Sequence, residues 1–242
     1  MTAQKVIPIK PLTAWSFSRY QTYQQCPAKL KYSAIMKLKE PQNEAMARGE
    51  MVHKLAERYV KGEIPAKTPP ELAKFKDELV RLRAMYKKIS QSMTAEDQWS
   101  FRSDWSETTW NDWNGCWLRI KLDLAHHEDD ETLIVTDWKT GKFREDKNAE
   151  YLEQLELYAL TALLLHEHIQ KVKPRLIYLD LGVVYPLVDK PITYTRADIP
   201  RLKKVWEKRV APMLSDTVFA PRPNNLCSWC HFRKDNGGPC AF

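Results

Sequence analysis

Two aspartates and a lysine lie in two short stretches whose composition is typical of β-strands. The stretch LRIKLDLAHH contains Asp123, and the stretch IVTDWKTGK contains Asp137 and Lys139. Because side chains alternate along a strand, Asp137 and Lys139 should point to one face and Trp138 to the other. Two carboxylates are suitable ligands for Mg²⁺ or Mn²⁺, and a lysine beside such a metal can position or deprotonate its activated water. The alternative is an exposed ion pair and an aspartate that caps a bulge, which would contribute little.

A glutamine, a tyrosine and a histidine on predicted helices can extend this set. Gln154 and Tyr158 lie four residues apart, so they share one face of the helix expected after the second strand. They could hold the lysine or a phosphate; the alternative is a core tyrosine beside a solvated glutamine. His53 lies at the edge of an apolar helical stripe, where a histidine is more often a satisfied core residue than a ligand. His53 indicates a functional site only when it is taken together with the two carboxylates.

Cysteines form a second candidate constellation. Cys227 and Cys230 make a CxxC motif, Cys240 follows after nine residues, and Cys26 lies far upstream. A CxxC motif suits zinc, an iron–sulfur cluster or a redox pair. His231, next to Cys230, could replace one ligand. The fifth cysteine, Cys116, is interpreted as a buried structural thiol.

The composition is that of an ordinary soluble globular protein. Of its 242 residues, 43% are hydrophobic and 29% are charged, and no apolar run approaches the roughly 18 residues that a transmembrane helix needs. The first residues lack the charged-then-apolar pattern of a signal peptide, so we expect a cytoplasmic protein with no membrane contact. Lys and Arg number 38 against 31 Asp and Glu, and the resulting charge of +7 is compatible with a polyanionic partner.

The hydrophobic periodicity predicts helices before, between and after a block of strands. Helices are expected over residues 15–38, 45–60, 71–89, 149–169 and 198–214. Strands are expected over residues 98–110, 115–127, 132–142 and 174–188. Pro27 should bend or restart the first helix, and Asp198 should start the last one. The turn EDDE should make an antiparallel pair of the strands that carry Asp123 and Asp137, which would bring the two carboxylates together.

These elements predict an α/β fold with a mixed central β-sheet flanked by helices. We expect one domain over residues 1–242. Its parts are a mainly helical segment at 15–98, a sheet and helix that carry the carboxylates at 99–188, and a C-terminal helix with the cysteines at 198–242.

Taken in order, the motifs RGEMVH, KLD, TDWKTGK and QLELY resemble those of the RecB-like branch of the PD-(D/E)xK nucleases. The segment RYQTYQQCPAKLKY is similar to the N-terminal signature of that branch, and the resemblance spans residues 16–240. It implies a restriction-endonuclease-like core and a metal-dependent deoxyribonuclease. Many relatives carry Glu where this chain has Asp137, and the family accepts both. The implied roles are metal ligands at Asp123, Asp137 and the Trp138 backbone carbonyl, an additional ligand or metal-tuning group at His53, the catalytic lysine at Lys139, and a supporting helix motif at Gln154 and Tyr158.

The cysteines resemble those of a subset of this family, which includes CRISPR-associated and helicase-linked AddB-like nucleases. In that subset one early cysteine and three late ones bind a [4Fe–4S] cluster. The resemblance implies that Cys26, Cys227, Cys230 and Cys240 hold such a cluster and join the two ends of the chain. Zinc is the alternative, because thiolate sites suit it too.

The function expected from these features is that of an exonuclease on single-stranded or end-frayed DNA, in recombination, replication or repair, including phage or CRISPR contexts. No helix-turn-helix or zinc-finger spacing indicates a sequence-specific reader. A helicase, an annealing protein or a CRISPR-integration protein would be a suitable partner. The alternative is a non-catalytic DNA-binding accessory subunit that keeps the fold. The intact Asp123, Asp137 and Lys139 argue against it.

Aromatic and basic clusters have two interpretations each. Five of the nine tryptophans crowd into residues 99–117. Tryptophans can stack on unpaired bases, but on strands they are more often packing residues, and we favour packing. The basic residues of the last helix, from Arg201 to Arg209, are interpreted as a solvated face rather than as phosphate contacts.

Overall fold

The computed structural model describes residues 12–88 and 93–242. Most of the segment considered for a signal peptide lies outside these residues. Ile89, the last residue of the helix predicted over 71–89, also lies outside them. The main helices are α1 (Phe17–Gln25), α2 (Pro27–Leu30), α3 (Glu44–Lys61), α4 (Lys76–Lys88), α5 (Asn148–Leu165) and α6 (Ile199–Ser215). The strands are β1 (Met93–Phe101), β2 (Leu118–His127), β3 (Thr132–Lys139), β4 (Lys171–Tyr178), β5 (Val183–Tyr185) and β6 (Tyr194–Thr195).

The strands form one mixed sheet in the order β1-β2-β3-β4-β5, with β6 pairing β4. The β1–β2 and β2–β3 pairs are antiparallel, whereas β3 and β4 are parallel. The parallel pair requires a crossover, and α5 supplies it. The predicted mixed sheet and the antiparallel pairing through the EDDE turn are therefore confirmed.

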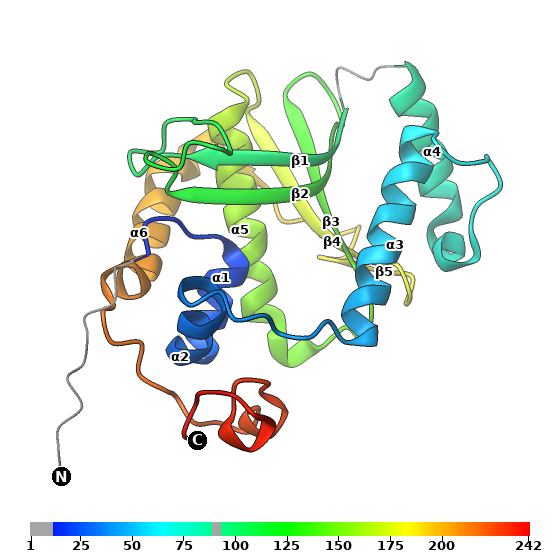
Figure 1. Cartoon of the computed structure of the whole chain (residues 1–242). Coiled ribbons are helices and arrows are strands. Elements are labelled where there is room, and N and C mark those ends of the chain that lie inside the picture. The colour runs from blue at the N-terminus through cyan, green and yellow to red at the C-terminus, as the bar shows by residue number, and fades with distance from the viewer. Residues whose placement is uncertain (1–11, 89–92) are drawn as a thin grey trace, which may run out of the picture.

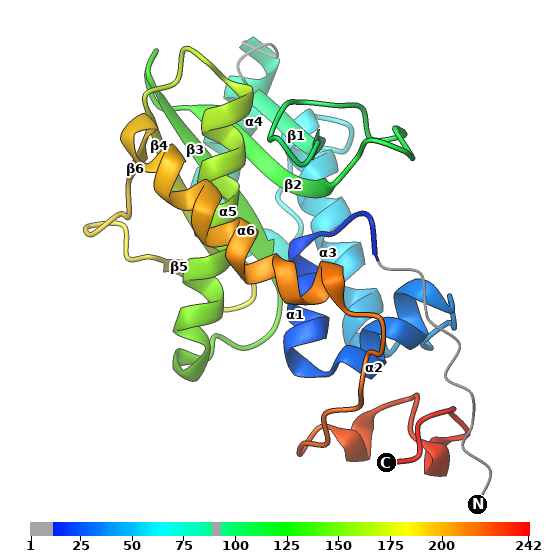
Figure 2. The same cartoon turned by 90° about the vertical axis from the view of Figure 1, so that its left-hand side faces the viewer.

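Helices cover both faces of the sheet (Figures 1 and 2). Helices α5 and α6 pack on one face, and with α1 and the inner sides of β1 and β2 they enclose the larger apolar core. Helices α3 and α4 pack on the opposite face and enclose a second core, which contains Trp138. Trp138 thus lies on the opposite face from Asp137, which meets α5. The alternation predicted for β3 is confirmed.

Several element boundaries differ from the predictions for local reasons. Strand β1 ends at Phe101, and residues 102–117 form a loop instead of continuing the predicted strand. The side chain of Asp112 closes this loop by accepting hydrogen bonds from Thr108 Oγ1 (2.7 Å) and from the Gly115 amide (2.8 Å). The strand predicted over 174–188 is a hairpin of β4 and β5, whose turn contains Gly182 at φ 73°.

The helix termini show how single residues set boundaries. Pro27 is the first residue of α2, so a new helix starts there after α1 has ended, as predicted. A π-helical turn then runs to Ile35. Helix α5 ends at Leu165, four residues before its predicted end. Helix α6 starts directly after Asp198, as predicted, although the Asp198 carboxylate caps the preceding 3₁₀ turn by bonding Thr195 and within α6 bonds the Arg201 side chain rather than a backbone amide.

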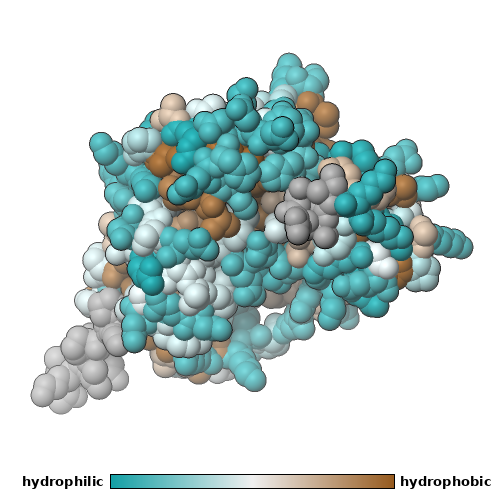
Figure 3. All heavy atoms as spheres, turned by 90° about the horizontal axis from the view of Figure 1, so that it is seen from above, coloured by the Kyte–Doolittle hydropathy of each residue, from teal (hydrophilic) through white to brown (hydrophobic). Residues whose placement is uncertain are grey.

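Polar residues cover most of the face seen from above, with small separate apolar patches between them (Figure 3). Within residues 12–88 and 93–242, no helix combines the length and apolar content needed to cross a bilayer.

Candidate active site

Asp123 lies at an irregular point of the sheet. The β1–β2 ladder pairs Ala95 with Leu124 and Asp97 with Leu122, but Glu96, opposite Asp123, has φ 56° and interrupts the regular pairing. The Asp123 Oδ2 atom accepts a hydrogen bond of 2.7 Å from the Trp138 amide. Trp138 directly follows Asp137, so this bond brings the two carboxylate-bearing strand ends into register.

His53 reaches Asp123 from α3, on the other side of the carboxylate. Its Nδ1 atom lies 3.3 Å from Asp123 Oδ1. Burial lowers the pKa of His53, but the hydrogen bond and the negative charge of Asp123 outweigh it, so the pKa is raised overall. The pKa of Asp123 is also raised, chiefly by burial and further by the charge of Asp137, while His53 opposes the shift. Since a divalent cation would favour the ionised carboxylate, these shifts describe the metal-free site.

Asp137 has two oxygen atoms in different environments. Its Oδ1 atom accepts hydrogen bonds from the Tyr158 hydroxyl (2.8 Å) and from Gln154 Nε2 (3.1 Å). Its Oδ2 atom is buried and accepts no hydrogen bond from the described residues. Lys139 Nζ lies 2.7 Å from Oδ2 and forms an ion pair with it. Oδ2 therefore retains the capacity to bind a cation.

Gln154 and Tyr158 bond Asp137 rather than Lys139. Gln154 Nε2 also bonds the Tyr158 hydroxyl at 2.9 Å, so the two side chains and the carboxylate form a closed triangle. The pKa of Tyr158 is raised well above its usual range by burial and by the charges of the two aspartates. Tyr158 therefore remains a hydrogen-bond donor to Asp137. The expectation that this pair holds the lysine is corrected, and so is its alternative of a solvated glutamine, because Gln154 is buried.

Two cavities flank this centre, and Lys121 lines both. The first, here called the α1–α5 cavity, has a volume of about 580 Å³ and is bordered by Lys139, Gln154 and Tyr158. The second has a volume of about 490 Å³ and is bordered by His53 and Asp123. The carboxylates are therefore reached by a cavity on either side.

The donor set fits a hard divalent cation. In the part of the chain that the structure describes, no three His, Cys, Asp or Glu side chains converge into a complete metal site. The buried Oδ2 atom of Asp137, which is paired with Lys139, and the adjacent Asp123 carboxylate nevertheless supply the oxygen ligands that Mg²⁺ and Mn²⁺ prefer. Such cations usually bind through one or two carboxylates and take their other ligands from water and substrate phosphates.

The sequence did not single out a contact that joins α3 to the end of β3. Arg48 donates two hydrogen bonds to Asp180, at 2.8 and 2.6 Å, and Asp180 Oδ2 also accepts one from the Gly141 amide at 2.8 Å. A side chain at Gly49 would come within 3.1 Å of Thr140 Oγ1, so the helix packs closely on the residues after Lys139. Both Arg48 and Gly49 belong to the RGEMVH motif, so this motif was the feature of the sequence that could have indicated the contact.

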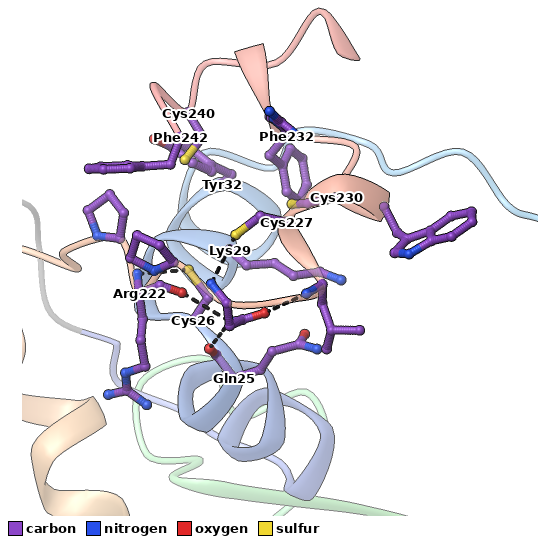
Figure 4. Close-up of a pocket in the computed structure, with 16 residues that line it drawn as sticks. Gln25, Cys26, Lys29, Tyr32, Arg222, Cys227, Cys230, Phe232, Cys240 and Phe242 are labelled. Atoms are coloured by element: carbon purple, nitrogen blue, oxygen red, sulfur yellow. Dashed lines mark hydrogen bonds between the residues drawn. The ribbon is translucent and has the colours of Figure 1, made fainter. Parts of the chain in front are cut away.

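The four predicted cysteine ligands line one cavity of about 160 Å³, between the α1–α2 junction and the C-terminal segment (Figure 4). Cys26 Sγ accepts a hydrogen bond from the Arg222 amide (3.4 Å), and Cys227 Sγ accepts one from the Asn224 amide (3.3 Å). Backbone amides that point at sulfur are typical second partners of ligating thiolates. The sulfurs surround the cavity without forming a compact metal site.

The loop between Cys230 and Cys240 is folded back on itself. The Cys240 amide bonds the Phe232 carbonyl at 2.8 Å, and a side chain at Gly238 would collide with the Phe232 backbone at 2.2 Å. His231 does not line the cavity, so its predicted role as a replacement ligand has no support from the geometry. Cys116 is buried and donates to the Leu118 carbonyl, as expected of a structural thiol.

The predictions of packing for the clustered tryptophans and of a solvated face for the basic residues of α6 each hold for some residues and not for others. Trp99 and Trp105 are buried, which confirms packing for them, whereas Trp113 is 77% exposed. In α6, Arg201 and Lys208 are exposed, but Arg209 is paired with Glu153 and Glu156 of α5. The solvated face predicted for α6 is therefore confirmed only in part.

Comparison with known families agrees with the fold. The chain belongs to the PD-(D/E)XK nuclease superfamily, whose family profile matches residues 14–234. No curated protein matched the chain. Among solved structures, the crystal structure of SSO0001 is similar at 15% identity and a TM-score of 0.39, over 93% of this chain and 85% of that one. A protein from Eubacterium rectale named "Putative exonuclease" is similar at 11% identity and a TM-score of 0.45, over 90% of this chain and 87% of that one.

Proposed function

We propose that this protein is a metal-dependent deoxyribonuclease that hydrolyses phosphodiester bonds of single-stranded or end-frayed DNA, starting from ends. The observation that carries the proposal is the environment of Asp137. One of its oxygens is held by Tyr158 and Gln154, and the other is buried, without a hydrogen bond, and next to Lys139. A carboxylate held in this way is oriented to bind a cation rather than to stabilise the fold.

In this site each side chain has a separate task. Asp137 and Asp123 would hold Mg²⁺ or Mn²⁺ with the Trp138 carbonyl, and His53 would tune Asp123 through their hydrogen bond. When bound, the metal polarises a phosphoryl oxygen and lowers the pKa of a water ligand. Lys139 would position or deprotonate the attacking water and stabilise the charge that develops on the phosphate. Lys121, which lines both cavities, would contact the DNA backbone.

End-labelled linear DNA, single- and double-stranded, tests the proposal when it is incubated with Mg²⁺ or Mn²⁺ beside a circular single strand. We expect metal-dependent digestion of linear DNA and resistance of the circle. Asp137→Ala should lower the cleavage rate more than about a hundredfold while DNA affinity is kept or raised, because the lost carboxylate also repelled phosphate. The exposed Asp189→Ala variant is the control. Digestion by Asp137→Ala at the normal rate would exclude this site, and DNA binding without cleavage by the wild type would favour the accessory-subunit function.

We further propose that Cys26, Cys227, Cys230 and Cys240 bind a [4Fe–4S] cluster, with zinc as the alternative, and that the chain works as one nuclease domain. The shared cavity and the two amide-to-sulfur hydrogen bonds support the cluster. The three late cysteines lie on a segment with few buried apolar residues, so burial alone holds it weakly. If thiolates from both ends of the chain hold the cluster or metal, the free energy of its binding would also stabilise the fold.

A further inference from the structure

The α1–α5 cavity extends from the carboxylate centre to the loop between β1 and β2. Five basic residues and a single acidic one, Glu150, line it; the basic residues are Arg19, Arg119, Lys121, Lys139 and Lys147. Lys147 is paired with Glu150 (2.9 Å), Lys121 with Glu96 (2.7 Å) and Lys139 with Asp137 (2.7 Å), which leaves Arg19 and Arg119 without a carboxylate partner among the described residues. The remaining positive charge can follow a phosphate backbone towards the active site.

Arg119 differs from the other cations because its partners are aromatic. Its guanidinium lies 5.7 Å from the centre of the Trp110 ring and 5.3 Å from that of Trp113, and its Nε donates to the Trp110 carbonyl at 3.2 Å. Among the described residues no carboxylate lies within ion-pair distance of it. Trp110 and Arg119 line the cavity, and Trp113 lies next to Arg119; the two indoles and the guanidinium form one cluster, here called the Trp113 platform.

The platform is held in place but left uncovered. Its loop is closed by Asp112, which bonds Thr108, the Gly115 amide and Arg102. Trp113 nevertheless remains 77% exposed, whereas Trp99 and Trp105 of the same region are 3% and 4% exposed. An exposed aromatic ring on a loop that Asp112 closes, next to the Arg119 guanidinium, needs little rearrangement to meet a ligand.

We propose that the Trp113 platform stacks on an unpaired base and makes this site selective for single-stranded DNA, an inference that rests on the proposed nuclease function. Every base has a flat π-face, so stacking on tryptophan is independent of sequence, and Arg119 adds contact to a base or a phosphate. In a duplex the same faces are covered by neighbouring bases, so the platform gains nothing from double-stranded DNA. The DNA backbone then follows the basic cavity to Lys139.

Strand geometry sets the length of DNA that reaches the platform. Arg119 precedes Asp123 by four residues on β2. At about 3.3 Å per residue the separation along the strand is about 13 Å, which is more than one nucleotide of an extended single strand can span. A single nucleotide bound at the carboxylates therefore cannot touch Trp113, whereas a longer strand can.

Binding of fluorescein-labelled oligo(dT) to the full-length protein in EDTA tests the platform without any cleavage. For a strand of about 12 nucleotides, Trp113→Ala should raise the Kd about tenfold, Trp113→Phe should restore most of the affinity, and binding of a duplex should be unchanged. Trp229→Ala is the matched control, because Trp229 is 84% exposed but lies in the cysteine-rich segment. An equal loss for single strand and duplex, an equal loss in Trp229→Ala, or no loss in Trp113→Ala would overturn the proposal.

Cleavage assays separate this proposal from the proposed function. If the wild type digests DNA with Mg²⁺ or Mn²⁺, Trp113→Ala should raise the KM for long single strands and raise it much less for dinucleotides. If the wild type cleaves nothing, the nuclease proposal fails, while the binding result in EDTA still decides the role of Trp113. Tighter Trp113-dependent binding of oligo(rU) than of oligo(dT) would overturn the assignment to DNA.

Discussion

Arg48 and Asp180 lie 132 positions apart in the chain and form a two-point ion pair. Through the Gly141 amide, which also bonds Asp180, the pair connects the helix that carries His53 to the backbone that follows Lys139. It therefore couples the position of one candidate ligand to that of the candidate catalytic lysine. A largely exposed pair of this kind contributes little to stability, so its main effect should be on the geometry of the site.

We expect Arg48→Ala to lower the cleavage rate by about tenfold while the melting temperature changes little. Arg58→Ala is the control, since Arg58 also lies on α3 and has a similar exposed fraction of its side chain, 47% against 48%, but pairs only with Glu63. Steady-state cleavage and thermal unfolding measure the two effects. Equal rates for the two variants would show that the pair does not position the site.

The same pair gives a pH dependence of stability. The hydrogen bond from Arg48 is the main reason that the pKa of Asp180 is lowered to about 2. Because this pKa lies below the unfolded value of about 3.9, the contribution is complete above pH about 4 and disappears as the pH falls through about 2. The difference in melting temperature between the wild type and Arg48→Ala, although small, should follow this course.

Tyr158→Phe should weaken metal binding and lower the cleavage rate by about tenfold, because it removes one donor that orients Asp137. Gln154→Ala should have a similar effect. The double variant should lose less than the product of the two, because both side chains bond the same oxygen and each other. Titration with Mn²⁺ and initial rates measure these changes, with Tyr194→Phe, a buried tyrosine on β6, as the control. Strictly additive losses would indicate two independent roles.

Lys139→Ala should lower the cleavage rate far more than it weakens DNA or metal binding, because the ammonium acts on the nucleophile and on the developing charge. The exposed Lys142→Ala variant, three residues along the chain, is the control for a general loss of positive charge. Rates under saturating DNA and the Kd in EDTA separate the two contributions. An effect confined to affinity would make Lys139 a phosphate contact.

The protein purified without oxygen should be brown and contain iron and sulfide in near-equal amounts. Cys227→Ala should lose the colour and melt at a lower temperature, whereas Cys116→Ala should keep the colour, because Cys116 lies outside the cavity. Stoichiometric zinc without sulfide would replace the cluster by a zinc site. A colourless, metal-free and fully stable wild type would remove the metal site altogether.

Local patterns were sufficient for much of the candidate site. Strand alternation predicted that Asp137 and Trp138 face opposite sides of the sheet, and the four-residue EDDE turn predicted the β2–β3 pairing. Helical spacing placed Gln154 and Tyr158 on one face but did not identify their partner, because that depends on how α5 packs on the sheet. The loop at residues 102–117 was mistaken for a strand, since the hydrogen bonds of Asp112 that close it are not visible in a hydrophobic pattern. The Arg48–Asp180 pair is too distant in sequence for any spacing rule.

The parallel β3–β4 pair has a consequence for the order in which the site assembles. Strands β1, β2 and β3 are neighbours in the chain, so Asp123 and the Trp138 amide can meet through contacts of short sequence separation. Gln154 and Tyr158 reach the site only when α5 packs on the sheet. Strand β4 can pair with β3 only after this crossover helix has formed. Long-range pairing of this kind is slow because the loop entropy is lost before the contacts form. On a growing chain, the two aspartates would therefore come together first, and Asp137 would acquire its fixed orientation in a later, separate step of folding.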